Sequence, residues 1–588
     1  MQYLTQLAKK YEKSLAFLLL ISGFLGAIAG AVTATWQVPI ETAQVLLGLV
    51  SYDRGALPYA YHVTAFSMMN HIGCLFLAIT HSEAASSILL SSLMGIVVMQ
   101  TVAMAIFLIF RNAYLAPLLT VALAAAHFIG SGIAYPIIFL GTEHTYGRAG
   151  FFFILYAALF LAFSKFKTGF FLSSLALWIH PAWGLWFNMC LAIVLIVQHR
   201  RYNALLTPGN ILYYCLGVGL SVTAFLWQKL HYPVNLAIAP GDASEAKEIF
   251  LNYIRYWDYH RQKFADPRIL VTGFACAWLT FSFSALLMLR QRNASIGEKL
   301  FYSFVMLSTI LASLFVFLPS WFDPKFFPEF LVILMPGRFI NIPIFLCTPI
   351  FLGSAMLWIS SSNQLFSETS RLQVALVAVA LLLSFTIFVE LYDFRHAILF
   401  SCLGAGLFWG IRKTRAPRYL SFSLINPLAF SVCLALTLAS PLYLSIKFPS
   451  IEQRFQKIAL PRNIDGSILT TMDNWLLQVK TRVSTITPHI DGYVYLGGNS
   501  LIRLNQLAID IFGISLTTPP PSNMALHQSA FATADFKDLW ESRECGEWEQ
   551  LSTKYHFGLI LVPTTMHLKL QQIGDDPEWH EYRPVCVR

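Results

Sequence analysis

The chain has few charged residues for its length. Asp, Glu, Lys and Arg make up 12% of its 588 residues, whereas 56% are hydrophobic. A typical soluble domain carries about twice that share of charge. The composition therefore excludes an ordinary soluble protein and predicts a polytopic membrane protein.

The sequence also lacks the motifs of nucleotide-binding and metal-binding proteins. It contains no GxxxxGK[ST] motif and no strand-linked GxGxxG pattern, which argues against an ATP-driven pump. Its nine cysteines form no CxxC or Cys/His pattern with metal-ligand spacing. We expect no cofactor, while a divalent metal stays an open alternative.

Long apolar windows dominate residues 1–446 instead. Each window is roughly 20 residues long, which is the length that a helix needs to cross a bilayer. We predict an all-α polytopic membrane bundle of about thirteen transmembrane helices. The spans are expected near 14–36, 86–110, 113–131, 149–165, 168–180, 181–198, 209–228, 268–290, 301–318, 337–360, 373–390, 394–411 and 420–446.

Basic residues between the spans predict an orientation. Residues 447–588 hold 13 basic and 15 acidic residues, which leaves 27 basic and 16 acidic residues in 1–446. Cations in short loops mark the cytoplasmic side of a membrane, so this surplus does not require a nucleic-acid partner. The strongest markers are Lys165/Lys167, Arg200/Arg201, Arg290/Arg292/Lys299 and 412–415. We expect a multi-pass protein of the cytoplasmic (inner) membrane with a cytoplasmic N-terminus.

Residues 61–80 complicate this topology. The segment is apolar enough to span but carries Asn70 and His71 at mid-depth. A re-entrant or interfacial helix fits the later loops best, because polar groups at membrane depth are tolerated where they line protein or a watery cavity. The alternative is a true span, with Arg111 facing outward and another short span unrecognised.

Residues 447–588 predict a small extracytoplasmic α/β domain. Buried strands are expected at 466–471 and 557–563, and helices at 474–482 and 536–555. Cys545 and Cys586 lie in this polar region and could pair in an oxidising compartment, or could both stay free thiols.

The first external loop, residues 37–85, contains the leading candidate for catalysis. Glu41 and Gln44 share one face of a predicted amphipathic helix, which would hold Glu41 near the lipid headgroups. A carboxylate there could accept a proton from an incoming hydroxyl group. Alternatively, Glu41 only caps or solvates the helix. Asp53, beside Arg54, suits an ion pair or a turn, with a catalytic or metal role as the other possibility.

Other external loops collect hydrogen-bonding side chains that could bind a substrate. The glycine-bounded loop 141–148 carries Glu143, His144, Tyr146 and Arg148, and it could surround an anion or be a simple connector. His180 precedes Pro181, which should break the apolar stretch at the outer surface; the tryptophans around it also fit an interfacial aromatic belt.

Two charged loops complete the predicted set. His260 and Arg261 lie in 252–268, and Arg338 and Asn341 lie where residues 335–341 enter a span. Arginine at the outer surface suits bidentate capture of a phosphate. Snorkelling to lipid headgroups is the alternative.

The arrangement resembles the GT-C class of integral membrane glycosyltransferases. The likeness lies in the acidic helix-bearing loop after span one, about a dozen spans, short basic cytoplasmic links and an external C-terminal domain. The segments 38–44, 141–147, 180–184 and 335–341 also look like a set from uncharacterised bacterial multi-spanning proteins, a likeness that brings no assigned activity.

The GT-C resemblance implies inverting sugar transfer from a polyprenyl-phosphate-linked donor on the outer membrane face. By position it maps the acidic base onto Glu41. The chain departs from the pattern because many members carry two neighbouring acidic residues in this loop, whereas Glu41 stands alone until Asp53. The expected partners are membrane lipid and the lipid-linked donor, in synthesis of a cell-envelope polysaccharide. The alternatives are a transporter or flippase for a lipid-linked or envelope glycan precursor, and a non-catalytic envelope-assembly protein.

Overall fold

A computed structural model describes most of the chain. The described residues are 2–117, 119–121, 146–234, 243–257, 267–290, 294–321, 326, 334, 336–361, 460, 464–471, 477–487, 491–498, 500–520 and 533–586. Most of the predicted span 113–131 and all of the predicted spans 373–390, 394–411 and 420–446 lie outside these residues.

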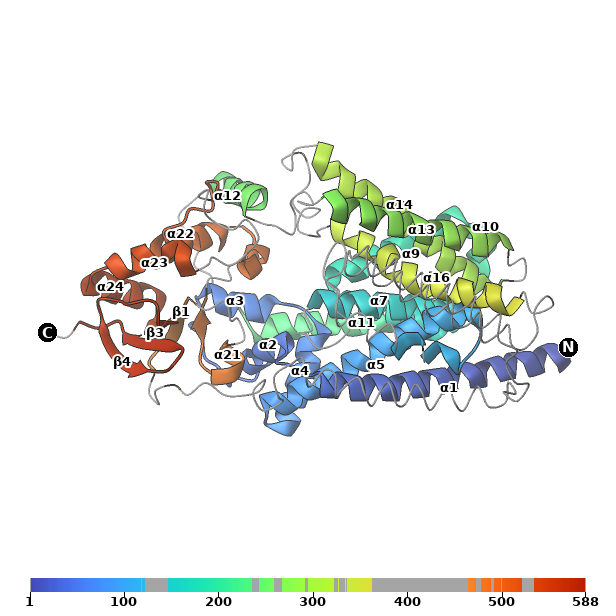
Figure 1. The fold of residues 1–588 in the computed structure, drawn as a ribbon, viewed down its shortest axis with the longest axis horizontal. Helices are drawn as coiled ribbons and strands as arrows, with labels where there is room; N and C mark the ends of the chain where they lie inside the picture. The colour runs from blue at the N-terminus through green and yellow to red at the C-terminus, as the bar shows by residue number, and fades with distance from the viewer. Residues whose placement is uncertain are drawn as a thin grey trace, which may run out of the picture.

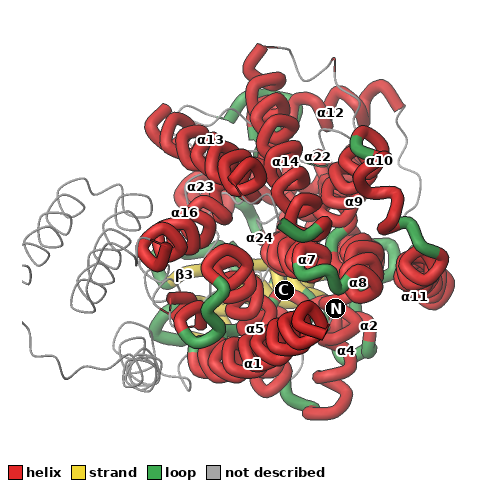
Figure 2. The backbone as a smooth tube through the Cα atoms, turned by 90° about the vertical axis from the view of Figure 1, so that its right-hand side faces the viewer, coloured by secondary structure: helices red, strands yellow, loops and turns green. Residues whose placement is uncertain are grey.

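A bundle of apolar helices forms the larger part of the molecule (Figures 1 and 2). Its long members are α1 (Gln2–Val32), α5 (Glu83–Phe110), α7 (Tyr146–Ala162), α8 (Phe166–Ile179), α9 (Pro181–Val197), α11 (Pro208–His231), α13 (Pro267–Arg290), α14 (Ile296–Trp321) and α16 (Asn341–Ser361). Within the described residues, five helices are long and apolar enough to cross a membrane, or up to seven if each of two bent pairs counts as one span. These helices are consistent with a multi-pass membrane protein; the count of thirteen stays a prediction.

Small residues bring α1 and α5 into close contact. A Cβ atom added at Gly26 would lie 2.3 Å from the carbonyl oxygen of Gly95, and one at Gly30 would lie 2.1 Å from that of Ser91. Only glycine permits such backbone approach, and small residues four positions apart are typical of tightly packed membrane helices. The contact fixes α1 along α5, so the end of α1 determines where the loop after residue 32 begins.

A bent helix pair and a helical hairpin meet at their turns. Helices α3 (Leu57–Thr64) and α4 (Met68–Thr80) are bent by 96°, so residues 61–80 do not form one straight span. Helices α8 and α9 turn at His180 as predicted from Pro181, and Asn188 Nδ2 donates to the Ser173 carbonyl at 2.8 Å across the resulting hairpin. The two turns are joined where Ser67 Oγ donates to the Ile179 carbonyl at 2.7 Å.

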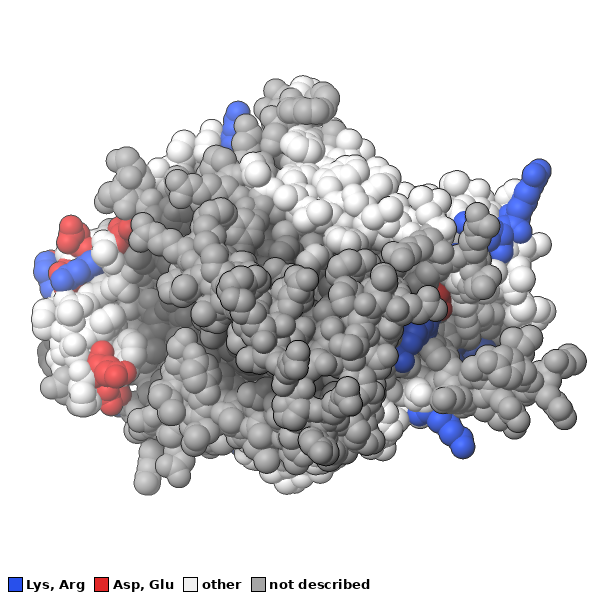
Figure 3. Space-filling model, turned by 45° about the vertical axis from the view of Figure 1, so that its right-hand side comes forward, with Lys and Arg blue, Asp and Glu red and all other residues white. Residues whose placement is uncertain are grey.

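Basic side chains gather at the end of the bundle that faces away from the C-terminal domain. Lys165 lies between α7 and α8, and Arg200 and Arg201 lie on α10 (His199–Tyr202), which continues through η1 (Asn203–Leu205). At the same end, Arg111 pairs with Glu298. Figure 1 shows the N-terminus at this end, and Figure 3 shows several Lys and Arg side chains here. On the C-terminal domain, Figure 3 shows both basic and acidic side chains.

The C-terminal part contains a five-stranded mixed sheet in the order β2-β1-β3-β5-β4. The strands are β1 (Ser467–Thr470), β2 (Thr485–Ile486), β3 (Phe557–Pro563), β4 (Gln571–Asp575) and β5 (Trp579–Arg583). β1 lies parallel to β2 and β3, whereas β5 is antiparallel to both β3 and β4. The predicted strands 466–471 and 557–563 are therefore confirmed, as β1 and β3.

Helices α21 (Leu477–Thr481), η5 (Asp491–Leu496), α22 (Ser500–Phe512), α23 (Thr533–Ser542) and α24 (Cys545–Tyr555) accompany the sheet. The single helical stretch predicted at 536–555 is thus two helices, separated at Arg543 and Glu544. Trp540 and Trp548 are fully buried in the core. Cys545 and Cys586 form a disulfide.

One helix from the loop between α11 and α13 joins the core of the C-terminal domain. Ile249, Phe250 and Tyr253 of α12 (Ala243–Tyr256) are buried in the same apolar cluster as Leu504 of α22. Trp257 Nε1 also donates to the Thr518 carbonyl at 2.9 Å. The C-terminal domain is therefore tied to the bundle through α12 as well as through the first loop.

Candidate functional site

Glu41 lies on α2 (Val38–Leu46), the short helix that follows α1. Pro39 starts this helix, because its ring fixes the backbone angle and its missing N–H is not needed in the first turn. Every residue from Val38 to Leu46 is buried. This corrects the expectation of an amphipathic helix lying along the membrane interface: α2 is enclosed by protein.

The Glu41 carboxylate has His62 as its neighbour. His62 Nε2 lies 3.8 Å from Glu41 Oε1, and the two side chains are 4% and 11% exposed, respectively. His62 Nδ1 lies 3.1 Å from Thr42 Oγ1, which is also 3.1 Å from the Tyr146 hydroxyl. Four polar side chains from α2, α3 and α7 therefore come together at the end of α1.

The C-terminal domain covers this cluster through α21. Gln478 Nε2 donates to the Glu41 carbonyl at 2.8 Å. The Tyr52 hydroxyl donates to Gln478 Oε1 and accepts from the Thr485 backbone N–H at 3.1 Å. Burial and the charge of Glu41 both raise the pKa of Tyr52. The phenol therefore stays protonated and remains a hydrogen-bond donor at neutral pH.

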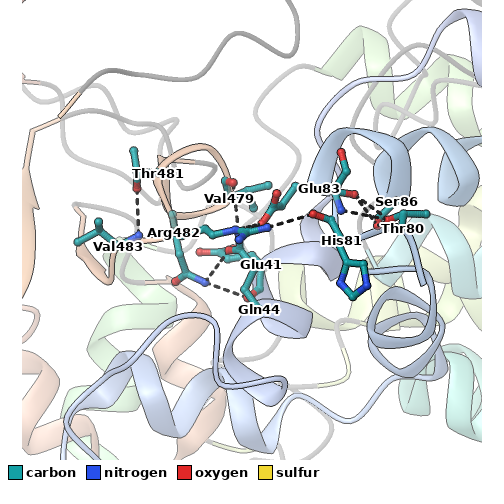
Figure 4. A network of polar contacts seen from close by, with 12 residues as sticks. Glu41, Gln44, Thr80, His81, Glu83, Ser86, Val479, Thr481, Arg482 and Val483 are labelled. Carbon is teal, nitrogen blue, oxygen red and sulfur yellow. Dashed lines mark hydrogen bonds and ion pairs between the residues drawn. The ribbon is translucent and has the colours of Figure 1, made fainter. Parts of the chain in front are cut away.

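Gln44 takes part in a second contact between the domains (Figure 4). Its Nε2 donates to Glu83 Oε1 at 3.1 Å and to the Val479 carbonyl at 3.2 Å. Glu83, at the start of α5, also pairs with Arg482, whose guanidinium donates to the His81 carbonyl at 3.4 Å. Gln44 was predicted to bind substrate; here its amide holds the C-terminal domain on the bundle.

Asp53 lies on the surface beside the C-terminal domain. Its side chain is 53% exposed and faces His556 Nε2 at 3.7 Å. Its Oδ1 also accepts from the Gly55 backbone N–H at 3.0 Å. This environment matches the ion-pair and turn interpretation, and the catalytic role stays a prediction.

A second group forms around the α8–α9 break. His180 Nδ1 accepts from the Trp183 backbone N–H at 3.4 Å, so the ring caps α9. Its Cβ packs on α7, because a Cβ added at Gly150 would lie 2.5 Å from it. Arg338 on η3 (Pro336–Ile340) lies close enough for its charge to act on His180. Arg148 stands two positions before Gly150 on α7.

Asn341, the first residue of α16, is 2% exposed. Its Nδ2 has no hydrogen-bond partner among the described residues. Such an orphaned donor, close in sequence to Arg338 and at a helix N-terminus, suits contact with an anion.

Two of the tryptophans near His180 are enclosed by protein. Trp183 and Trp186 are buried at 6% and 4% exposure. Trp186 stacks on Phe339 with ring centroids 4.1 Å apart, and Trp183 meets the same ring edge-on at 5.0 Å. They pack α9 against η3 and so fix Arg338 relative to His180.

The structure brings several predicted residues into two neighbouring groups. Glu41 and Tyr146 meet around Thr42, and His180 lies close to Arg338; α7 connects the groups because it carries both Tyr146 and Arg148. Glu143, His144, His260 and Arg261 lie outside the described residues. Among the residues that are described, no three His, Cys, Asp or Glu side chains are placed to hold a metal ion.

Sequence reasoning missed two members of the first group, Thr42 and His62, and two residues that cover it, Tyr52 and Gln478. The sequence offered a clue to Thr42, because it directly follows Glu41, and to His62, because it is a polar residue of the same loop. Gln478 is 437 positions from Glu41, and no local pattern connects them. Comparison with protein-family models and with curated proteins gives no match for this chain.

Proposed function

We propose that the chain is a membrane glycosyltransferase that takes a sugar from a polyprenyl-phosphate-linked donor and uses Glu41 as its base. The observation that carries the proposal is the environment of Glu41. A carboxylate just after the first long apolar helix lies beside an imidazole, under the C-terminal domain, and at the end of the bundle opposite the basic residues (Figure 1).

The chemistry needs few protein groups. The acceptor hydroxyl loses its proton to the Glu41 carboxylate as its oxygen bonds to the anomeric carbon of the donor. The bond from that carbon to the phosphate oxygen breaks, and the electron pair leaves with the phosphate. Arg148 and Arg338 supply the positive charge for this leaving group, and Asn341 Nδ2 adds a donor. Holding both reactants near the headgroups contributes by proximity.

The same proposal sets the orientation of the chain. The end of the bundle with Lys165, Arg200 and Arg201 faces the cytoplasm, in keeping with the positive-inside bias. Glu41 and the C-terminal domain then face outward from the cytoplasmic membrane, and the Cys545–Cys586 disulfide suits such an oxidising side.

The test is transfer by purified protein in proteoliposomes that contain a polyprenyl-phosphate sugar. Glu41→Gln keeps the size of the side chain and the backbone carbonyl that Gln478 contacts, but it removes the base. We expect transfer to fall by a factor of about a hundred or more. Glu298→Gln is the matched control, because Glu298 is also a buried carboxylate but pairs with Arg111 at the other end of the bundle. Full transfer by folded Glu41→Gln protein would refute the proposal.

A transporter or flippase is the second candidate, and the α3–α4 bend, which meets the α8–α9 turn at Ser67 and Ile179, favours it. Broken helices often line substrate pathways in transporters. This candidate predicts that a cysteine substituted for His180 reacts with a labelling reagent alternately from one side of the membrane and from the other. It also predicts that no sugar donor is consumed. A transferase predicts donor consumption and reactivity from the outer side alone.

A further inference from the structure

His62 was not among the residues expected to act at this site, yet its imidazole lies beside the Glu41 carboxylate. Both of its ring nitrogens face a polar group: Nε2 faces Glu41 Oε1 at 3.8 Å, and Nδ1 faces Thr42 Oγ1 at 3.1 Å. The first distance is in the ion-pair range and is longer than a hydrogen bond.

The polarity of these contacts selects one tautomer. If the imidazole is neutral and Glu41 is ionised, Nε2 must carry the proton, because a bare nitrogen would turn its lone pair toward the carboxylate. Nδ1 then accepts from the Thr42 hydroxyl, which in turn accepts from the Tyr146 hydroxyl at 3.1 Å. The hydrogen bonds run in a single direction from Tyr146 of α7 through Thr42 of α2 to His62 of α3, whose Nε2 faces the Glu41 carboxylate at 3.8 Å.

The exposure of the two side chains and the contacts of the ring indicate which member of the pair can react with a substrate. The Glu41 side chain is 11% exposed and that of His62 is 4% exposed. With both ring nitrogens turned to protein groups, the imidazole has no nitrogen left for an acceptor hydroxyl. The carboxylate is therefore the reacting group, and the imidazole is its support.

We propose that His62 is a positioning residue that holds the Glu41 carboxylate ionised and in place, with its own tautomer fixed by Thr42 and Tyr146. The catalytic part of this inference rests on the proposed transferase function.

The inference predicts a shift in pH dependence. The titratable groups facing His62 in the described part of the chain are Glu41 of α2, Tyr52 of the loop before α3, Tyr61 of α3 and, through Thr42, Tyr146 of α7. Of these types, only a carboxyl group ordinarily titrates below neutral pH. A donor beside a buried carboxylate lowers its pKa, so removing the donor should raise it.

The experiment compares His62→Phe with His62→Gln. Phenylalanine keeps a ring against Tyr52 and Tyr61 but removes both nitrogens, whereas glutamine can return an amide N–H toward Glu41. We expect the acidic limb of the pH profile of kcat/KM to move upward by about one pH unit in His62→Phe and to lie near its original position in His62→Gln. His231→Phe, at the exposed end of α11, is the control for loss of a histidine and should leave the profile unchanged.

Infrared difference spectra give a second readout that needs no activity. Subtracting the spectrum of Glu41→Gln isolates the Glu41 carboxyl band, and its titration midpoint should also rise in His62→Phe. If the wild type transfers no sugar but this midpoint moves, the transferase function fails and the pairing stands. If transfer occurs and neither the rate profile nor the infrared midpoint moves in His62→Phe, the pairing is refuted.

Discussion

The contact between Glu83 and Arg482 should largely determine how firmly α21 rests on the bundle. The two residues are 399 positions apart, and their side chains are 3% and 39% exposed, respectively. Breaking a fully buried ion pair costs roughly 3–5 kcal/mol, and breaking an exposed pair costs about 0.2–1 kcal/mol. Because Arg482 is partly solvated and Glu83 keeps the Gln44 donor, we expect Arg482→Gln to cost about 2 kcal/mol.

Hydrogen–deuterium exchange measures this cost as local opening. A loss of about 2 kcal/mol corresponds to a roughly 30-fold faster exchange of the α21 amides, since each 1.4 kcal/mol is a factor of ten. Glu83→Gln and the double variant complete a cycle, in which the coupling free energy should exceed about 1 kcal/mol. Asp53→Asn is the control, because the Asp53–His556 contact crosses the same interface between side chains that are 53% and 66% exposed. Exchange of α21 that is no faster in Arg482→Gln than in Asp53→Asn would refute the reasoning.

Two further predictions concern the bundle and the C-terminal domain. Gly30→Ala should prevent α1 from packing on α5, because its Cβ would lie 2.1 Å from the Ser91 carbonyl oxygen, whereas Gly219→Ala on α11 meets nothing within 4 Å. The yield of folded protein by size-exclusion chromatography checks this pair, and equal yields would contradict it. In the C-terminal domain, partial burial raises the pKa of Asp510, but hydrogen bonds from Lys554, Tyr555 and Gln506 outweigh it and leave that pKa below its ordinary value. The stability from Asp510 is therefore present above the unfolded-state pKa and is lost as the pH falls through the folded-state pKa. As the pH falls, amide exchange in α22 and α24 should therefore accelerate less steeply in Asp510→Asn than in the wild type. Identical pH dependence in the two proteins would contradict this prediction.

The sequence predicted the features that depend on local chemistry. Apolar windows marked long helices such as α1 and α5, because a buried helix needs a continuous apolar surface. Pro181 marked the α8–α9 turn, because proline cannot donate to the preceding turn. The buried runs at β1 and β3 marked two strands of the sheet. Each of these signals lies within a few residues of the structure that it specifies.

The rest depended on contacts between distant segments. Gln478 and Arg482 reach α2 and α5 from a domain more than 390 positions away. A glutamine in a short helix, or an arginine just after it, gives no sign of such a partner. The loop holding α12 was noted for its charges, yet Ile249, Phe250 and Tyr253 fall on one helical face and bury against α22. The amphipathic spacing of these residues can be read from the sequence, but the surface of the C-terminal domain that they cover cannot.

The burial of Glu41 has a consequence for any reaction at this site. An 11% exposed carboxylate under α21 offers little room for an acceptor hydroxyl, so a substrate must displace part of the contact that Gln478 and Arg482 maintain. The strength of that contact then has two opposing effects. A firm contact keeps Glu41 beside His62 and excludes water, whereas a loose one admits the acceptor more often. Variants that weaken α21 without touching Glu41 should therefore change the KM for the acceptor before they change the pH dependence, while loss of His62 should do the reverse.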